Sequence, residues 1–242
     1  MLTAMLGTAA RLAHSQTAAP NLQQGVSGIT PFYVEYDVGN NLINAGVAKL
    51  SLKSQGDEWI YSLVTEPSGI FRLTGKGRIH EVSIINVNKD RLIPRSYSYS
   101  QAGDEKRRNI DAQFNWEGKQ LTIQSRGEEE TEALTDPILD RLSVTLAVMD
   151  QVRKGFSNAE MQVLDAGKIK TMEFINEGKE TLDTKLGRME TIVVRRTREG
   201  SSRETVTWFA PSLNYVPVQM EQLKRGKLVA RLTINKLEQS PD

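Results

Sequence analysis

Apolar and polar side chains alternate along most of this chain from residue 32 onward. Phe32, Val34 and Tyr36 occupy even-numbered positions, whereas Tyr33 and Glu35 lie at the odd-numbered positions between them. Because successive side chains of a strand point to opposite faces, this period of two predicts strands with one buried face. Similar runs recur about every ten residues with short turns between them, which favours antiparallel strands.

One segment has the period of a helix instead. In "TDPILDRLSVTLAVMDQVRKG", Asp136 fits an N-cap, Pro137 the first helical position and Gly155 the residue after the last turn. An apolar stripe runs along it, made of Ile138, Leu142, Leu146, Met149 and Val152. We therefore predict a helix over about residues 136–154, which packs on the concave face of a sheet or plugs an opening.

The fold class that follows is mainly β: one antiparallel curved sheet or open β-barrel, with that single helix. Residues 31–238 form one β domain in this interpretation. The run "RLIPRSYSYSQ" (91–101) resembles "NYVPVQMEQLK" (214–224), since each places a proline before an alternating strand. This similarity suggests two related β meanders, 31–135 and 158–238, joined by the helix.

The first 30 residues leave two interpretations open. "MLTAMLGTAARLAHSQTAAP" is rich in Ala, Leu and Thr, and Ala13-His14-Ser15 resembles a signal-peptidase site. No basic residue precedes the apolar run, however, and Arg11 interrupts it. The segment is either a degraded signal peptide of an exported protein or the disordered tail of a cytosolic one.

Composition narrows the classes of function. The chain has 242 residues, a net charge of +1 and no cysteine. The absence of cysteine excludes disulfides, Cys-zinc sites and thiol catalysis. A nearly neutral chain lacks the basic excess typical of nucleic-acid binding, and no run reaches the roughly 18 apolar residues of a membrane-spanning helix. We expect no cofactor, no nucleic acid, peripheral or no membrane contact, and a monomer or homodimer.

Four stretches carry a resemblance to a known family. They are the aromatic strands around Gly46, "DPILDRLSVTLAVMDQVRKG", "LDTKLGRMETIVVRR" and "TWFAPSLNYVPVQMEQLKRG". Together they resemble an uncharacterised family of exported bacterial proteins, the domain of unknown function 3108, over about residues 31 to 238. The resemblance implies an exported antiparallel β protein. More distantly, the chain is similar to periplasmic lipoprotein carriers, whose half-barrel holds an acyl chain. No catalytic residue carries over.

Catalytic and metal-binding motifs are scarce. His14 lies in the N-terminal segment, and His80 and Glu81 are neighbours in a strand, so they face opposite sides. No nucleophile or zinc motif accompanies them, and we predict neither a catalytic residue nor a metal site. The acidic run "GEEETE" (127–132) fits a solvated strand or turn, in which at most half of the carboxylates face one ion.

Two basic groups, Lys106-Arg107-Arg108 and Arg195-Arg196-Arg198, are interleaved with acids. A solvated surface is the simpler interpretation, and contact with lipid head groups or an anionic glycan is the functional one. The aromatic side chains are typical of a core, but a curved sheet can also enclose an apolar ligand. The residues that we predict to line such a cavity are Trp59, Tyr61, Phe114, Trp116 and Trp208.

The sequence therefore favours a non-enzymatic, periplasmic binding or chaperone-like protein of the cell envelope. Its ligand would be a lipid, lipoprotein or glycan. Two alternatives stay open: a hydrolase that uses a carboxylate pair, whose separation is a three-dimensional property, and a scaffold that associates through a strand edge.

Overall fold

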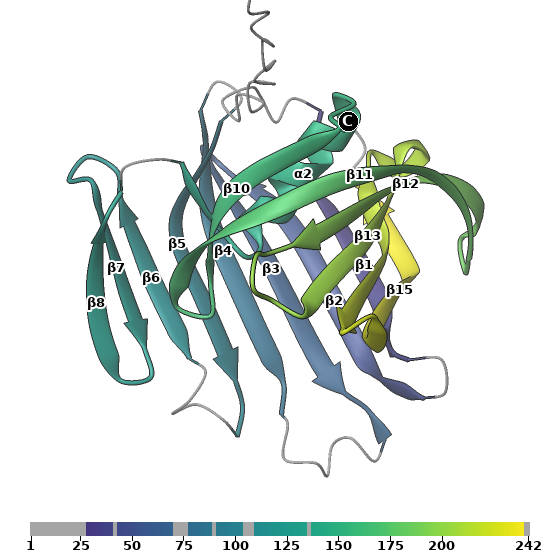
Figure 1. Cartoon of the computed structure of the whole chain (residues 1–242), viewed down its shortest axis with the longest axis horizontal. Helices are drawn as coiled ribbons and strands as arrows, with labels where there is room; N and C mark the ends of the chain where they lie inside the picture. The colour runs from purple at the N-terminus through teal and green to yellow at the C-terminus, as the bar shows by residue number, and fades with distance from the viewer. Residues whose placement is uncertain are drawn as a thin grey trace, which may run out of the picture.

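A computed structural model describes residues 28–40, 43–69, 77–88, 91–103, 109–134 and 137–239. In this part of the chain, fifteen strands form one continuous sheet with a single α-helix, α2 (Figure 1). The elements are β1 (Phe32–Gly39), β2 (Asn44–Gln55), β3 (Glu58–Pro67), β4 (Ile79–Asn88), β5 (Arg91–Gln101), β6 (Ile110–Asn115), β7 (Gln120–Ser125), β8 (Glu128–Ala133), β9 (Ile138–Asp140), α2 (Ser143–Arg153), β10 (Asn158–Asp165), β11 (Lys168–Thr184), β12 (Gly187–Thr197), β13 (Arg203–Ala210), a 3₁₀ turn η2 (Pro211–Leu213), β14 (Val216–Lys224) and β15 (Lys227–Gln239).

The sheet has the order β8-β7-β6-β5-β4-β3-β2-β1-β15-β14-β13-β12-β11-β10-β9. The first and last strands are therefore neighbours in its middle, and β8 and β9 form its edges. Each neighbouring pair is antiparallel except β9 and β10, which are parallel. The sheet does not close into a barrel. The predicted mainly β fold with one helix is confirmed; the relatedness of the two meanders stays a prediction.

The helix begins at Ser143 rather than near residue 136, so its predicted start is wrong. Asp136, the predicted N-cap, lies outside the described residues, and Ile138 belongs to β9. Asp140 explains the difference: its Oδ1 accepts the backbone N–H groups of Leu142 and Ser143, at 2.8 and 2.9 Å. A carboxylate that binds the first free N–H groups of a helix fixes where the helix begins.

The C-terminal end of α2 agrees with the prediction. Gly155 has a φ of +76°, and its N–H donates to the carbonyl of Val152. The N–H of Phe156 donates to the carbonyl of Gln151. These two hydrogen bonds form a Schellman motif, whose left-handed residue is favourable for glycine because it has no Cβ.

Two prolines lie in the interior of strands, Pro94 in β5 and Pro217 in β14, and each lies at a β-bulge. In β5, Ile85 pairs with Pro94 and Ile84 pairs with Ser96. In β14, Phe209 of β13 pairs with Pro217, and the register shifts by one residue beside it. A bulge removes the need for the N–H that proline lacks.

An aromatic side chain completes each of these bulges. The indole Nε1 of Trp116 donates to the Pro94 carbonyl at 2.6 Å, and the Tyr36 hydroxyl donates to the Pro217 carbonyl at 2.9 Å. Both carbonyls therefore keep a hydrogen-bond partner where the ladder is irregular.

The core lies between the two halves of the sheet, which curves back over itself. In Figure 1, β10 and β11 cross in front of β3 to β5, with α2 between them. One cluster of buried side chains joins both halves to the helix, including Tyr61, Leu146 and Phe174. Alternation turns one face of each strand toward this interior, and the candidate site lies there.

Candidate ligand-binding cavity

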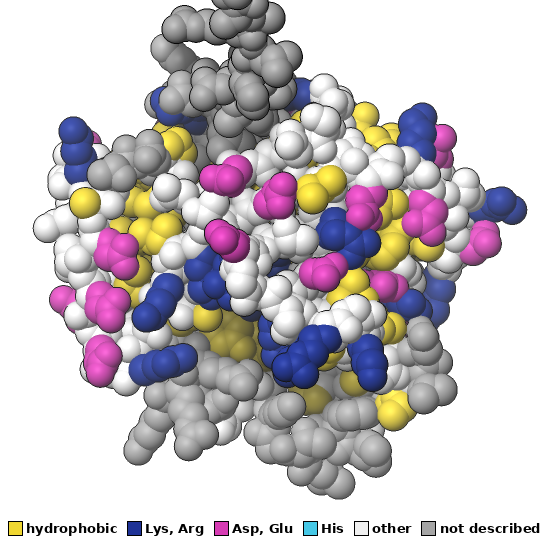
Figure 2. Space-filling model, viewed as in Figure 1, with side chains coloured by type: hydrophobic (Ala, Val, Ile, Leu, Met, Phe, Trp, Pro, Cys, Tyr) yellow, Lys and Arg dark blue, Asp and Glu magenta, His cyan; other side chains and the backbone are white. Residues whose placement is uncertain are grey.

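Two adjoining hollows open between the halves of the sheet. The first, the chamber, has a volume of about 160 Å³. The second, the vestibule, has a volume of about 600 Å³. Both are lined in part by Arg141, Arg196, Thr205 and Gln222, so they meet at these residues. In Figure 2, Lys and Arg side chains gather near the middle of one face, around a hollow in which hydrophobic side chains are visible.

The chamber is mainly apolar because inward-facing positions of several strands meet α2 there. Its wall is formed by Leu50, Tyr61, Leu63, Val144, Val148, Phe174, Val194, Phe209, Met220 and Leu232, among others. Filling such a space with hydrocarbon removes apolar surface from water on both sides, which is favourable by about 25 cal/mol per Å².

A bidentate ion pair forms one side of the junction between the hollows. Arg141 donates through Nε to Glu81 Oε2 at 3.0 Å and through Nη2 to Glu81 Oε1. The Tyr97 hydroxyl also donates to Glu81 Oε2, at 3.1 Å. The guanidinium lies 5.4 Å from the ring centroid of Tyr99. Burial acts to lower the pKa of Arg141, but the Glu81 carboxylate outweighs it and the pKa is raised.

Asp140 anchors the helix beside this ion pair. Its carboxylate is fully buried and accepts the hydroxyls of Ser83 and Ser143 at 2.6 and 2.8 Å, besides the two backbone N–H groups. Burial raises the pKa of Asp140, and these hydrogen bonds oppose the rise. Glu81, which lines the chamber, and the nearby buried Asp140 thus both have their hydrogen-bond partners within the protein.

Arg196 forms the other side of the junction and is surrounded differently. It is half-buried and donates through Nη2 to the Thr205 hydroxyl at 2.8 Å. Within the described part of the chain, no carboxylate lies within ion-pair distance of it. Burial lowers the pKa of Arg196, and the nearby Arg141 adds to the effect, whereas Asp165 opposes it.

The vestibule carries an excess of positive charge. Its lining contains one carboxylate, Asp165, and six cations: Arg126, Arg141, Lys170, Arg196, Arg198 and Arg203. Lys170 pairs with Asp165 at 2.7 Å, and this ion pair lowers the pKa of Asp165 although burial acts to raise it. The vestibule therefore suits an anion although the whole chain is nearly neutral.

Tyr61 is the predicted cavity residue that the structure places in the chamber wall. Its side chain is fully buried, and its hydroxyl has no hydrogen-bond partner among the described residues. Burial raises its pKa, with a further contribution from Asp140. The hydroxyl is therefore neutral and keeps an unused hydrogen-bond donor beside the chamber.

The other four predicted residues lie outside the lining of the chamber and the vestibule. Phe114 stacks on Trp116, with ring centroids 6.1 Å apart. The Trp208 indole donates to Glu180 at 2.8 Å, and Trp59 packs against the core. These side chains have packing roles in the structure.

The basic run Arg195-Arg196-Arg198 divides between the two faces of β12. Arg195 pairs with Glu177 and Glu204 and does not line either hollow, whereas Arg196 and Arg198 line the vestibule. Sequence reasoning marked the run as a contact for anionic groups but did not select Arg196. The second group, residues 106–108, lies outside the described residues.

His80 and Glu81 face opposite sides of β4, as predicted: His80 is exposed and Glu81 is buried. Sequence reasoning missed the role of Glu81 because its partner, Arg141, is 60 positions away. The alternation of β4 was the available signal, since it turns one carboxylate into the core.

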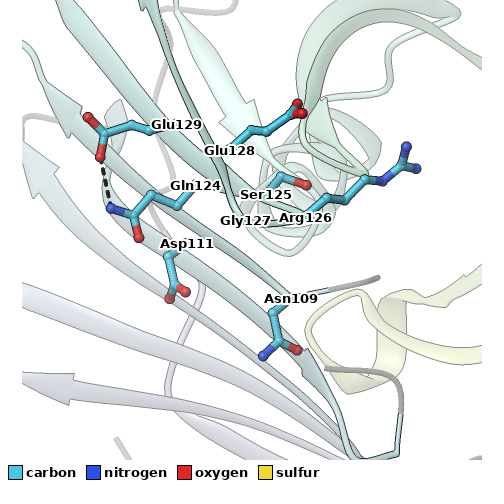
Figure 3. Close-up of a pocket in the computed structure, with 8 residues that line it drawn as sticks. All are labelled: Asn109, Asp111, Gln124, Ser125, Arg126, Gly127, Glu128 and Glu129. Carbon is cyan, nitrogen blue, oxygen red and sulfur yellow. Dashed lines mark hydrogen bonds between the residues drawn. The ribbon is translucent and has the colours of Figure 1, made fainter. Parts of the chain in front are cut away.

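A surface depression that shares Ser125 and Arg126 with the vestibule contains part of the acidic run. It is lined by Asn109, Asp111, Gln124, Ser125, Arg126, Gly127, Glu128 and Glu129. Figure 3 shows the three carboxylates pointing in different directions, with Gln124 donating to Glu129 at 2.9 Å. Across the described ranges, no group of three or more His, Cys, Asp or Glu side chains is arranged to hold a metal ion. Most of β8 is exposed, in agreement with a solvated strand.

The matching family model is described as a protein of unknown function, DUF3108, and covers residues 34–233. The chain therefore belongs to the DUF3108 family. A search of curated proteins finds no match.

The solved structures similar to the chain include the following two. One is a β-barrel-like protein of domain of unknown function DUF1849 from Brucella abortus, at 9% identity and a TM-score of 0.57, covering 88% of this chain and 99% of that one. This likeness supports the fold alone. The other, from Bacteroides fragilis NCTC 9343, is described as a presumed exported protein with a YmcC-like fold, at 10% identity and a TM-score of 0.33, covering 89% of this chain and 98% of that one. In the described segments, no helix is long and apolar enough to cross a membrane.

Proposed function

We propose that this protein is a non-enzymatic binding protein of the bacterial cell envelope that holds the apolar part of a lipid-like ligand. The observation that carries the proposal is the apolar chamber between α2 and the two halves of the sheet. Ligand sites are typically concave and mostly apolar, with a few polar groups that orient the ligand. The vestibule supplies such groups directly beside the chamber.

The size of the chamber limits what it holds. An apolar cavity of about 150 Å³ admits one benzene molecule, and the chamber has about 160 Å³. It therefore suits a segment of about six carbon atoms in this conformation. A short or terminal piece of an acyl chain fits this description.

The buried carboxylates support a binding role over hydrolysis. Glu81 is held by Arg141 and Tyr97, and Asp140 is held by two serine hydroxyls and two backbone N–H groups. A periplasmic location belongs to the same proposal and is supported by the sequence resemblance to exported proteins. Fractionation of the native host tests it: recovery only with cytosolic proteins would contradict it.

The binding test measures the affinities of two neutral probes with short hydrocarbon chains, 1-hexanol and 1-octanol, by isothermal titration calorimetry. Thr207 lines the chamber, so Thr207→Phe fills part of it. We expect at least a tenfold weaker affinity for both molecules, since losing the burial of two methylene groups costs about 1.6 kcal/mol.

Thr122→Phe is the matched control. Thr122 is also a strand threonine, but it lies on the face of β7 opposite the buried Leu121 and Ile123. It should bind like the wild type. The proposal fails if the wild-type protein binds neither molecule, or if both variants lose affinity equally while their melting temperatures stay close to that of the wild type.

A further inference from the structure

The junction between the two hollows places a cation where an amphiphile would change from apolar to polar. Arg196 lines both the chamber and the vestibule. On the chamber side it adjoins Val194, two residues earlier along the chain, and on the vestibule side Arg198, two residues later. Its ladder partner Thr205 lines both hollows. A molecule with its hydrocarbon end in the chamber therefore presents its other end to this guanidinium.

Arg196 has hydrogen-bonding capacity to spare. A guanidinium has five N–H donors in a planar fork, and one of them is used on Thr205. Arg141, at the same junction, directs two of its nitrogens to Glu81. The two arginines are thus similarly placed, but the structure supplies a carboxylate for Arg141, and in the described residues none for Arg196.

Other arginines of the vestibule, like Arg196, lack a carboxylate partner in the described part of the chain. Arg126, Arg198 and Arg203 also line the vestibule, and none has an ion-pair partner among the described side chains. Cations that line one concave surface repel each other, and an anion between them removes that repulsion. Guanidinium groups match carboxylate and phosphate especially well because two parallel N–H groups meet two oxygens.

We infer that the ligand is a single-chain amphiphile with an anionic head group, a phosphate or a carboxylate, that seats this group against Arg196 and its hydrocarbon in the chamber. This inference rests on the proposed binding function and specifies its ligand class. Arg126, Arg198 and Arg203 attract the head group through the vestibule, and Arg196 holds it. The Arg141–Glu81 pair is neutral overall and acts as a wall.

The experiment measures binding of four probes to the full chain by isothermal titration calorimetry. They are octyl phosphate, 1-octanol, octyltrimethylammonium and inorganic phosphate. We expect octyl phosphate to bind at least tenfold more tightly than 1-octanol, since a hydrogen bond to a charged group contributes about that factor. Octyltrimethylammonium should bind more weakly than 1-octanol because the arginines of the vestibule repel its positive charge.

Arg196→Gln isolates the head-group contact, and Arg195→Gln is its matched control. Both substitutions remove one positive charge from β12, but Arg195 is engaged by Glu177 and Glu204 outside the vestibule. Arg196→Gln should lower the affinity for octyl phosphate at least tenfold and leave the affinity for 1-octanol unchanged. Arg195→Gln should leave both affinities unchanged. In the wild type, a higher salt concentration should lower the affinity for octyl phosphate but not the affinity for 1-octanol.

Several outcomes overturn the inference. Equal affinity for octyl phosphate and 1-octanol means that no head-group site exists, although the chamber still binds. Equal losses in the two arginine variants mean a diffuse charge effect. Inorganic phosphate that competes as tightly as octyl phosphate means a site for free anions. If none of the three octyl probes binds, the proposed function fails together with the inference.

Discussion

Arg141 and Arg196 line the same junction, but their hydrogen-bond and ion-pair partners differ. Arg141 is joined to a buried carboxylate, a tyrosine hydroxyl and an aromatic face, all within the chain. Arg196 has one threonine hydroxyl. Burial works against the charge of both, but Glu81 leaves the pKa of Arg141 raised whereas that of Arg196 is lowered. A buried cation that has its own counter-ion is compatible with a stable fold. A buried cation without one lowers the stability of the free protein, and an anionic ligand can remove that penalty.

The strongest test of this comparison removes the counter-ion of Arg141. Glu81→Gln should lower the free energy of unfolding by about 2 to 3 kcal/mol, because it leaves a partly buried guanidinium without its carboxylate. Glu81 is 1% exposed and Arg141 35% exposed, which places the loss below that of a fully buried pair. Urea unfolding at neutral pH measures it.

The control for this variant is Glu190→Gln, which breaks the exposed ion pair with Lys179. Exposed pairs contribute little, so the midpoint should move far less than for Glu81→Gln. Similar shifts in the two variants would show that the Arg141 wall is no more important to stability than a surface pair.

The second test concerns stability without ligand on the Arg196 side. Arg196→Gln should leave the free energy of unfolding unchanged or raise it by up to about 1 kcal/mol, because it removes a charge that burial disfavours and loses one neutral acceptor. Arg141→Gln, in contrast, should destabilise, since it leaves Glu81 buried and unpaired. Thermal melting of the two variants tests this expectation. A clearly lower melting temperature for Arg196→Gln than for the wild type would mean that this arginine stabilises the fold.

The smallest expected effect is a pH dependence of opposite sign at two aspartates. Burial raises the pKa of Asp140 above its ordinary 3.8, so the folded state binds more protons in that window and stability falls as pH rises through it. The pKa of Asp165 is lowered by Lys170 although burial opposes this, so its stabilisation is present above 3.8 and is lost as pH falls through the folded value.

Urea unfolding of Asp140→Asn and Asp165→Asn between about pH 3 and 7 separates the two slopes. Relative to that of the wild type, the free energy of unfolding of Asp140→Asn should increase as pH rises above 3.8. That of Asp165→Asn should decrease relative to the wild type as pH rises from below 3.8. Two curves of the same sign would contradict the contrast between these environments.

Local patterns in the sequence predicted much of this fold. Alternation placed Phe32, Val34 and Tyr36 on a buried face, and all three are buried. Gly155 marked the end of the helix correctly. The start was missed because Asp136-Pro137 and Asp140 both resemble helix starts, and a long-range parallel pairing of Ile138–Asp140 with β10 decides between them. Propensity over a few residues does not contain that pairing.

The candidate site was less accessible to sequence reasoning. Tyr61 lines the chamber, as expected for a large aromatic at an inward-facing position of a strand, and its part in ligand binding stays a prediction. Arg141 was placed on a helix, although it lies just before one. Arg196 was visible as part of a basic run, and alternation within Arg195-Arg196 required one of the two to face inward. Which side is the interior depends on the curvature of a 15-stranded sheet, a property of the whole chain.

The pairing of β1 with β15 has a consequence for how the molecule is made. Asp37 and Asn235 touch across that pair although they are 198 positions apart. Synthesis proceeds from the N-terminus, so the edge of β1 that pairs with β15 stays open until β15 has emerged. Contacts this distant in sequence close slowly, and an unfinished edge invites intermolecular pairing. Assembly of the centre of this sheet is therefore the step at which a nascent chain is most exposed to aggregation.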